Sequence, residues 1–152
     1  DGTTGEDWIT RLESKGFRLV DYVKQVLHSP DFKPTSGVTT EVAVLKGRLF
    51  EENHRITKKI RVEAGKRKLS RPNAELACLI REKFTDEEIE QMGLWCLVAM
   101  HKPINGSDGD PRLLDATRGD GGRWLSACHG GADDGWDVVS GFAFAVLRRS
   151  QP

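Results

Sequence analysis

The chain has 152 residues, 38% of them hydrophobic and 30% charged, and its 23 basic and 23 acidic residues give a net charge of zero. This composition excludes a disordered chain, and the length suits one domain with its own core. The longest apolar run, residues 94–100, is seven residues, far short of the roughly 20 that span a bilayer. We therefore expect no membrane partner.

The N-terminal part of the chain predicts two helices and a strand. Residues 1–6 are expected to be disordered, and a helix begins at Asp7, where apolar residues follow at helical spacing. A second short helix fits residues 19–28 and ends before a proline, which disfavours helix in the residue that precedes it. Residues 38–46 alternate and are rich in β-branched side chains, which predicts a strand.

The middle of the chain predicts three helices over residues 53–93: the first ends before Gly65, and the second begins with Pro72 in its first turn. The third opens at Thr85 with Thr-Asp-Glu-Glu, which predicts a capping box. In this motif the Thr85 side chain accepts from the backbone N–H of Glu88, and the Glu88 side chain accepts from the backbone N–H of Thr85. Residues 94–100 fit either a continuation of that helix or a buried strand, and their short length favours the strand.

The C-terminal part predicts a β meander over residues 94–148. Its further strand candidates are residues 113–118, 123–129 and 141–147, with a glycine-rich hairpin turn at 119–122. The expected fold is α+β, a single domain over residues 7–152. It would contain an antiparallel sheet of about four to five short strands, a three-helix insert at 53–93 and N-terminal helices.

One cationic block stands out in this neutral chain. Residues 54–72 hold eight Lys or Arg and one acid, Glu63, which is a net charge of +7. Helical spacing puts Ile56, Ile60 and Ala64 on a face that must be buried and most of the cations on the opposite arc. The candidate partner-binding residues are Arg55, Lys58, Lys59, Lys66, Arg67, Lys68 and Arg71.

Three interpretations of this block remain open. Lysines and arginines that neutralise phosphates release counterions, which predicts contact with nucleic acid. The positive electrostatic potential of these residues also attracts an acidic protein surface. The third interpretation is a solvated helix, or one that pairs with the acidic third helix of the same fold. Our first hypothesis is a non-enzymatic binding module that uses the basic helix to contact nucleic acid or an acidic protein.

A second hypothesis is a small enzyme with its site near His101 and the Asp108/Asp110 loop. His101 follows an apolar run, so we expect a partly buried, tuned imidazole, and the two aspartates offer carboxylates for acid–base work. Residues 105–110 lack the twelve-residue pattern of a calcium loop and predict a turn. No cofactor signature is present, because the glycine-rich segments lack the residues of a phosphate-binding loop.

The three cysteines, Cys78, Cys96 and Cys128, predict free thiols in a reducing cytoplasm, because an odd count with long spacings makes a disulfide framework unusual. We expect no metal site. Cys128 and His129 are neighbours on a predicted strand and point to opposite faces, so they do not readily share one ion.

A third hypothesis is a structural protein that dimerises through an aromatic sheet face, and a homo-oligomer is therefore possible. The aromatic residues concerned are Trp124, Trp136, Phe142 and Phe144. Packing of these rings in the core is the competing interpretation.

Three stretches together suggest relatives: residues 44–47 (VLKG), residues 71–88 running on into Met92-Gly-Leu-Trp95, and residues 141–144 (GFAF). With these stretches the chain resembles a group of small bacterial hypothetical proteins with no assigned activity. The resemblance implies a bacterial, cytoplasmic protein, and it carries over no catalytic or binding residue.

Overall fold

The computed structural model describes residues 3–34, 41–119 and 122–146. The helices are α1 (Gly5–Ser14), α2 (Asp21–His28), α3 (Thr57–Lys66), α4 (Glu75–Lys83) and α5 (Asp86–Gln91), with 3-10 turns at Gly47–Leu49 and Glu52–His54. The strands are β1 (Phe17–Leu19), β2 (Val42–Lys46), β3 (Leu69–Ser70), β4 (Cys96–Ala99), β5 (Ile104–Asn105), β6 (Pro111–Gly119), β7 (Gly122–His129) and β8 (Ser140–Val146).

The strands form one eight-stranded mixed sheet in the order β1-β7-β6-β4-β8-β2, with β3 paired to β8 and β5 paired to β6. The pairs β1/β7 and β4/β8 are parallel. The structure is α+β, but the expected antiparallel sheet of four to five strands is wrong. The strands β1, β3 and β5 have only two or three residues each, too few to show an alternating pattern, and parallel pairing joins segments far apart in the sequence.

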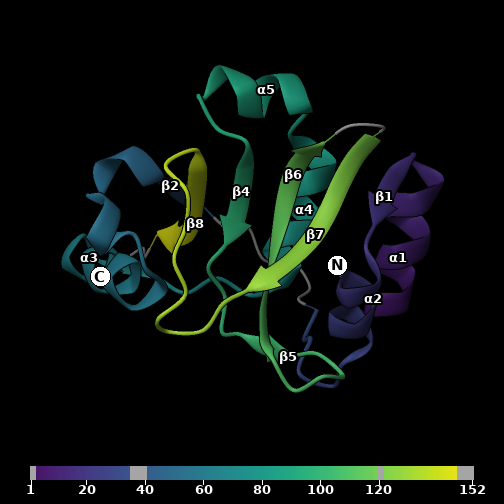
Figure 1. Ribbon diagram of the computed structural model, residues 1–152. Helices are drawn as coiled ribbons and strands as arrows, with labels where there is room; N and C mark the ends of the chain where they lie inside the picture. Colours follow the sequence, from purple (N-terminus) through teal and green to yellow (C-terminus); the bar gives the residue numbers. More distant parts are fainter. Residues whose placement is uncertain (1–2, 35–40, 120–121, 147–152) are drawn as a thin grey trace, which may run out of the picture.

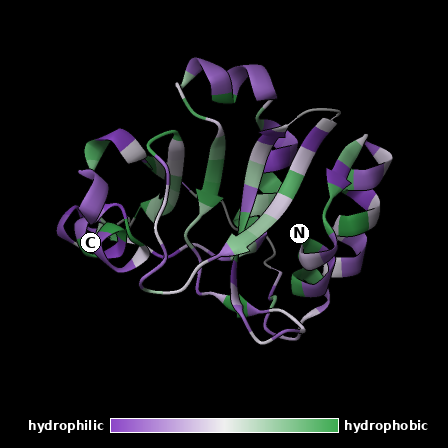
Figure 2. Ribbon diagram, viewed as in Figure 1, coloured by the Kyte–Doolittle hydropathy of each residue, from purple (hydrophilic) through white to green (hydrophobic). Residues whose placement is uncertain are grey.

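Helices cover both faces of the sheet (Figure 1). On β6, Leu114 faces α1, α2 and α4 and belongs to a buried cluster with Trp8 and Leu125. The preceding residue, Leu113, points to the other face and packs in a second cluster with Ile60 of α3 and Phe142 of β8. Successive strand residues alternate between faces, so one strand contributes to two cores. Figure 2 shows hydrophobic residues along the sheet and a largely hydrophilic α5 at its top.

Several local predictions are confirmed. The capping box at Thr85 opens α5 with both of its hydrogen bonds, and residues 96–99 form the buried strand β4. The strand expected at 38–46 is present as β2, and its residues 38–40 lie outside the described part of the chain. The turn expected at 119–122 connects β6 to β7 in antiparallel register, although residues 120 and 121 are not among those described.

Two boundaries differ from expectation for identifiable reasons. Residues 3–6, expected to be disordered, are described, and Thr4 and Asp7 form a capping box that starts α1 at Gly5. The helix expected from residue 53 begins only at Thr57, after a 3-10 turn, because Ile56 is extended and forms a β-bridge with Gly135. None of the described helices is long and apolar enough to cross a membrane.

Arg81 of α4 is fully buried and ties helices to the sheet. Its Nη1 donates to Thr117 O and Trp124 O at 3.2 and 3.3 Å. Its Nη2 donates to Phe84 O and to Asp86 Oδ1, each at 2.9 Å. One guanidinium therefore satisfies backbone carbonyls of β6 and β7 and fixes the turn between α4 and α5.

Replacing Arg81 with methionine keeps most of the side-chain volume and removes every donor. We expect the free energy of unfolding to fall by about 3 kcal/mol, because buried carbonyls and the Asp86 carboxylate lose their partner. Urea unfolding followed by circular dichroism measures the change. Lys83→Met, at an exposed position of the same helix, is the control, and equal losses in the two variants would contradict this role of Arg81.

Candidate functional site

The cationic block folds into a 3-10 turn, α3, β3 and the approach to α4. Ile60 and Ala64 are buried, as the helical spacing predicts. Arg55 does not belong to an exposed arc, because its Nε and Nη2 donate to Gly47 O and Phe50 O at 3.0 Å each. This arginine therefore holds a turn together rather than facing a partner.

The Arg61 side chain also donates to backbone carbonyl groups. Its two terminal nitrogens donate to Met100 O and His101 O, both at 2.8 Å. Burial and the nearby positive charge of Arg71 lower its pKa to about 10. Arg61 therefore fixes α3 to the end of β4 and is not available to a partner.

Two further cations pair with carboxylates at the surface. Lys58 Nζ lies 2.8 Å from Asp133 Oδ1, and Arg67 Nε lies 2.8 Å from Glu63 Oε2. Exposed pairs of this kind contribute about 0–1 kcal/mol, so a polyanion displaces them at little cost. Lys59, Lys66, Lys68 and Arg71 are exposed. Within the described residues the side chains of these four have no hydrogen bond or ion pair.

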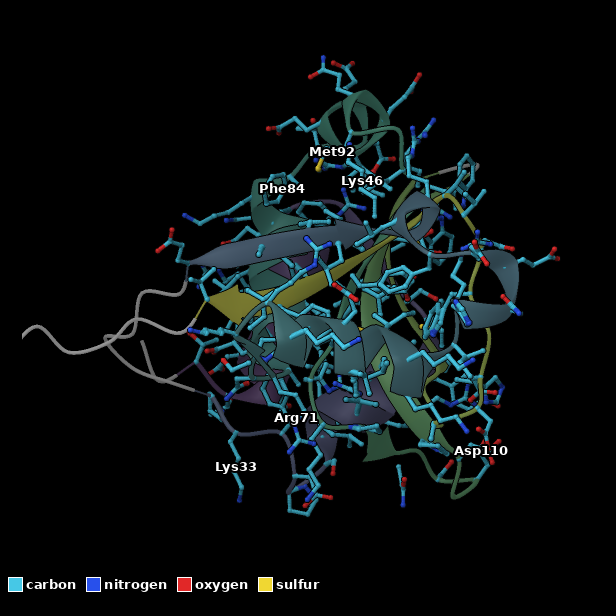
Figure 3. All side chains as sticks on the ribbon, turned by 90° about the vertical axis from the view of Figure 1, so that its left-hand side faces the viewer. Lys33, Lys46, Arg71, Phe84, Met92 and Asp110 are labelled. Atoms are coloured by element: carbon cyan, nitrogen blue, oxygen red, sulfur yellow. The ribbon has the colours of Figure 1, made fainter. Side chains whose placement is uncertain are left out.

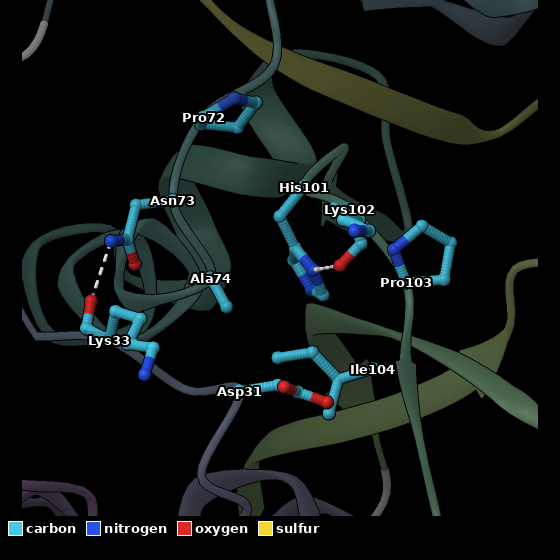
Figure 4. Close-up of a pocket in the computed structure, with 9 residues that line it drawn as sticks. All are labelled: Asp31, Lys33, Pro72, Asn73, Ala74, His101, Lys102, Pro103 and Ile104. Carbon is cyan, nitrogen blue, oxygen red and sulfur yellow. Dashed lines mark hydrogen bonds between the residues drawn. The ribbon is translucent and has the colours of Figure 1, made fainter.

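A cavity of about 280 Å³ lies beside this block, at the end of β4 and the start of α4 (Figure 4). Lys33 and Lys102 line it, together with one acid, Asp31. Asn73 closes one side, where its Nδ2 donates to Lys33 O at 2.6 Å and its Oδ1 accepts from Glu75 N at 2.7 Å. The cavity therefore extends the positive region around Arg71 toward Lys102.

We call Lys33, Lys59, Lys66, Lys68, Arg71 and Lys102 the cationic surface. Figure 3 looks onto the side of the molecule that carries α3 and shows Arg71 and Lys33 below that helix. The sequence missed Lys33 and Lys102 because each is an isolated cation, far from residues 54–72 along the chain. Both line the cavity whose wall includes Pro72, the residue after Arg71.

His101 lines the same cavity but is only 1% exposed. Its Nε2 accepts from Leu114 N at 3.1 Å, so Nδ1 carries the proton and donates to Lys102 O at 2.7 Å. Burial lowers its pKa to about 4, and the charge on Arg61 acts in the same direction. The ring is therefore neutral, and backbone groups occupy both of its nitrogens.

The carboxylates expected to work with His101 have other partners. Asp108 accepts from Asp110 N at 3.0 Å and from Arg112 Nη2 at 2.9 Å. The Asp110 carboxylate lies 3.9 Å from His129. Among the described contacts none joins His101 to either aspartate.

The aromatic residues of the C-terminal part mainly fill the core. Phe142 and Phe144 are buried, and Trp136 packs edge-on against Phe142 with ring centroids 5.6 Å apart. Trp124 is half-buried, with the Arg18 guanidinium 5.6 Å from its ring centroid. These rings do not form one exposed aromatic face.

Comparisons with protein-family models, with curated proteins and with solved structures find no match to this chain.

The buried neutral histidine predicts a pH dependence of stability. The pKa of His101 is about 4 in the folded chain and 6.5 when the ring is not buried. Between pH 4 and pH 6.5 the unfolded chain therefore binds a proton at His101 that the folded chain does not. The contribution of His101 to the free energy of unfolding is fully present above pH 6.5. It falls by about 3 kcal/mol as the pH decreases to 4. His101→Gln should therefore lose about 3 kcal/mol less than the unmodified chain over that range, measured by denaturant unfolding.

Both proteins retain Asp115, whose raised pKa changes stability in the opposite direction, so the difference between them isolates the histidine. His28→Gln, at an exposed position at the end of α2, is the control and should follow the unmodified chain. Parallel pH profiles for His101→Gln and the unmodified chain would refute a buried neutral imidazole.

Proposed function

We propose that this chain is a non-enzymatic binding module that holds nucleic acid through the cationic surface. The observation that supports this is a group of exposed cations, Lys59, Lys66, Lys68 and Arg71, that have no carboxylate partner within the described structure. A phosphate that approaches these four side chains displaces no ion pair with a carboxylate among the described residues.

The cationic surface suits a phosphate backbone better than it suits base edges. Lysine ammonium groups are flexible point charges, and each phosphate they neutralise releases condensed counterions. Within the described residues no exposed aromatic ring belongs to the cationic surface. The proposed binding is therefore independent of sequence and strongly dependent on salt.

Changing Lys59, Lys66 and Arg71 to glutamine in one protein removes three positive charges and leaves α3 intact, because all three positions are exposed. Affinity for a labelled single-stranded RNA should fall by at least ten-fold at low salt. The slope of log K against log salt should become shallower by about 2, at about 0.7 for each lost phosphate contact. Fluorescence anisotropy at several salt concentrations gives both quantities.

The control changes Lys15, Lys24 and Lys83 to glutamine, which removes the same charge from the end of α1, from α2 and from α4. Lys15 and Lys24 pair there with Glu82 and Glu13. The control variant should bind as the unmodified chain does. The proposal fails if the unmodified chain does not bind at low salt, or if both triple variants lose affinity equally. It also fails if polyglutamate competes with the RNA, because an acidic protein would then be the better partner.

A further inference from the structure

The face of the sheet that packs against α3 is not fully covered. Beyond α3, strands β4, β6 and β7 and the segment before β8 surround a hollow of about 410 Å³. Its lining includes Trp95, Cys96, Asp115, Cys128, Trp136 and Asp137. No residue of the cationic surface lines it. The volume lies in the range of small-molecule sites.

Asp115, in the middle of β6, is the most unusual group in this hollow. It lies opposite Val98 of β4 and Ser126 of β7, on strands that flank β6. The residue is only 7% exposed, and its Oδ1 has no hydrogen-bond partner among the described residues. A buried carboxylate oxygen without a donor costs free energy, and natural structures rarely leave one without a use.

The groups that face Asp115 do not neutralise it. The Cys128 thiol of β7 donates to Leu113 O at 3.3 Å, and Cys96 of β4 lines the same hollow. Burial raises the pKa of Cys96 to about 12 and that of Cys128 well above its usual value, so both remain neutral thiols. Burial also raises the pKa of Asp115 to about 7.

The rim of the hollow adds acids rather than available cations. Glu52 and Asp137 line it, together with Arg55. The Arg55 guanidinium donates to Gly47 O and Phe50 O through Nε and Nη2, and its single positive charge is outnumbered by the carboxyl groups of Glu52, Asp115 and Asp137. The hollow therefore has a negative character and lacks a strong donor aimed at Asp115.

Two tryptophans supply apolar walls. Trp95 is 47% exposed, and the Arg118 guanidinium lies over one face of its ring, 4.8 Å from the centroid. Trp136 Nε1 donates to Thr57 Oγ1 at 2.9 Å, which fixes its orientation. Aromatic faces attract cations as well as apolar groups. Carboxylates combined with indole rings are the chemistry that recognises an organic cation.

We propose that the hollow binds a small organic cation, an amine or amidine on a compact apolar body, whose N–H group donates to the Asp115 carboxylate while the body packs against Trp95 and Trp136. A bare metal ion fits less well, because the described part of the chain contains no group of three or more His, Cys, Asp or Glu arranged to hold one. This site is separate from nucleic-acid binding and does not depend on it.

Binding of an amine at this site should release a proton. An amine cation pairs with the ionised carboxylate, so binding near neutral pH displaces a proton from Asp115 into the buffer. Because the pKa of Asp115 is about 7, affinity should be roughly ten-fold higher at pH 8 than at pH 6. Glu52 and Asp137 are the other carboxylates that line the hollow, and both are exposed.

Isothermal titration calorimetry with benzylamine and benzamidine tests the site, with benzyl alcohol as the neutral analogue and benzoate as the anionic one. We expect binding of the two cations only, a ten-fold gain from pH 6 to pH 8, and an enthalpy that changes with the ionisation enthalpy of the buffer. Asp115→Asn, which keeps the shape of the side chain, should abolish the proton release and reduce affinity at least ten-fold. Asp108→Asn, on the loop between β5 and β6, is the matched control.

Trp95→Ala provides a second variant at an exposed position, and it should weaken the cations several-fold while leaving the proton release intact. If Asp115→Asn does not fold, the Trp95→Ala variant still tests the proposal. The proposal is overturned if neither cation binds, if benzyl alcohol binds as tightly as benzylamine, or if affinity is the same at pH 6 and pH 8. Unchanged binding by Asp115→Asn or by Trp95→Ala would also overturn it.

Discussion

The hydrogen bonds that β4 makes with its two neighbours hold this molecule together. One edge of β4 pairs antiparallel with β6, and the other pairs parallel with β8, so a four-residue strand joins the two halves of the sheet. Gly141 on β8 leaves room for the leucine side chains that pack at this pairing. A side-chain carbon there would lie 2.5 Å from Leu94 Cδ1 and 3.0 Å from Leu97 Cδ2. Burial of these leucines against β8 thus depends on the absence of a side chain.

The two proposed sites lie at opposite ends of β4. Cys96, at its start, lines the acidic hollow, and His101, just past its end, lines the cavity of the cationic surface. Arg61 fixes that second end to α3 through Met100 O and His101 O. A rigid central strand therefore separates a positive region from a negative one. This arrangement explains how a chain with no net charge presents two surfaces of opposite sign.

Much of the secondary structure was predictable because its signals are local. The capping box at Thr85 and the glycine-rich segment at residues 119–122 act within a few residues, and the structure has both the helix and the strand pair they predict. The parallel partners of β4 and β7 were not predictable, because pairing between distant segments leaves no periodic trace in either one. For the same reason β1 and β3 were missed, since their extended backbone depends on the strand beside them.

By itself, the sequence determined where charge concentrates along the chain, which face of α3 is buried, and which segments are helical. Only the tertiary structure decided which charges are available. It turned Arg55 and Arg61 onto backbone carbonyls, brought Lys33 and Lys102 to the cationic surface, and buried Asp115 without a partner for Oδ1. Local patterns reflect the backbone preferences and amphipathicity of one element. The solvation of a charge depends instead on what other elements place around it, and that is settled only when the chain packs.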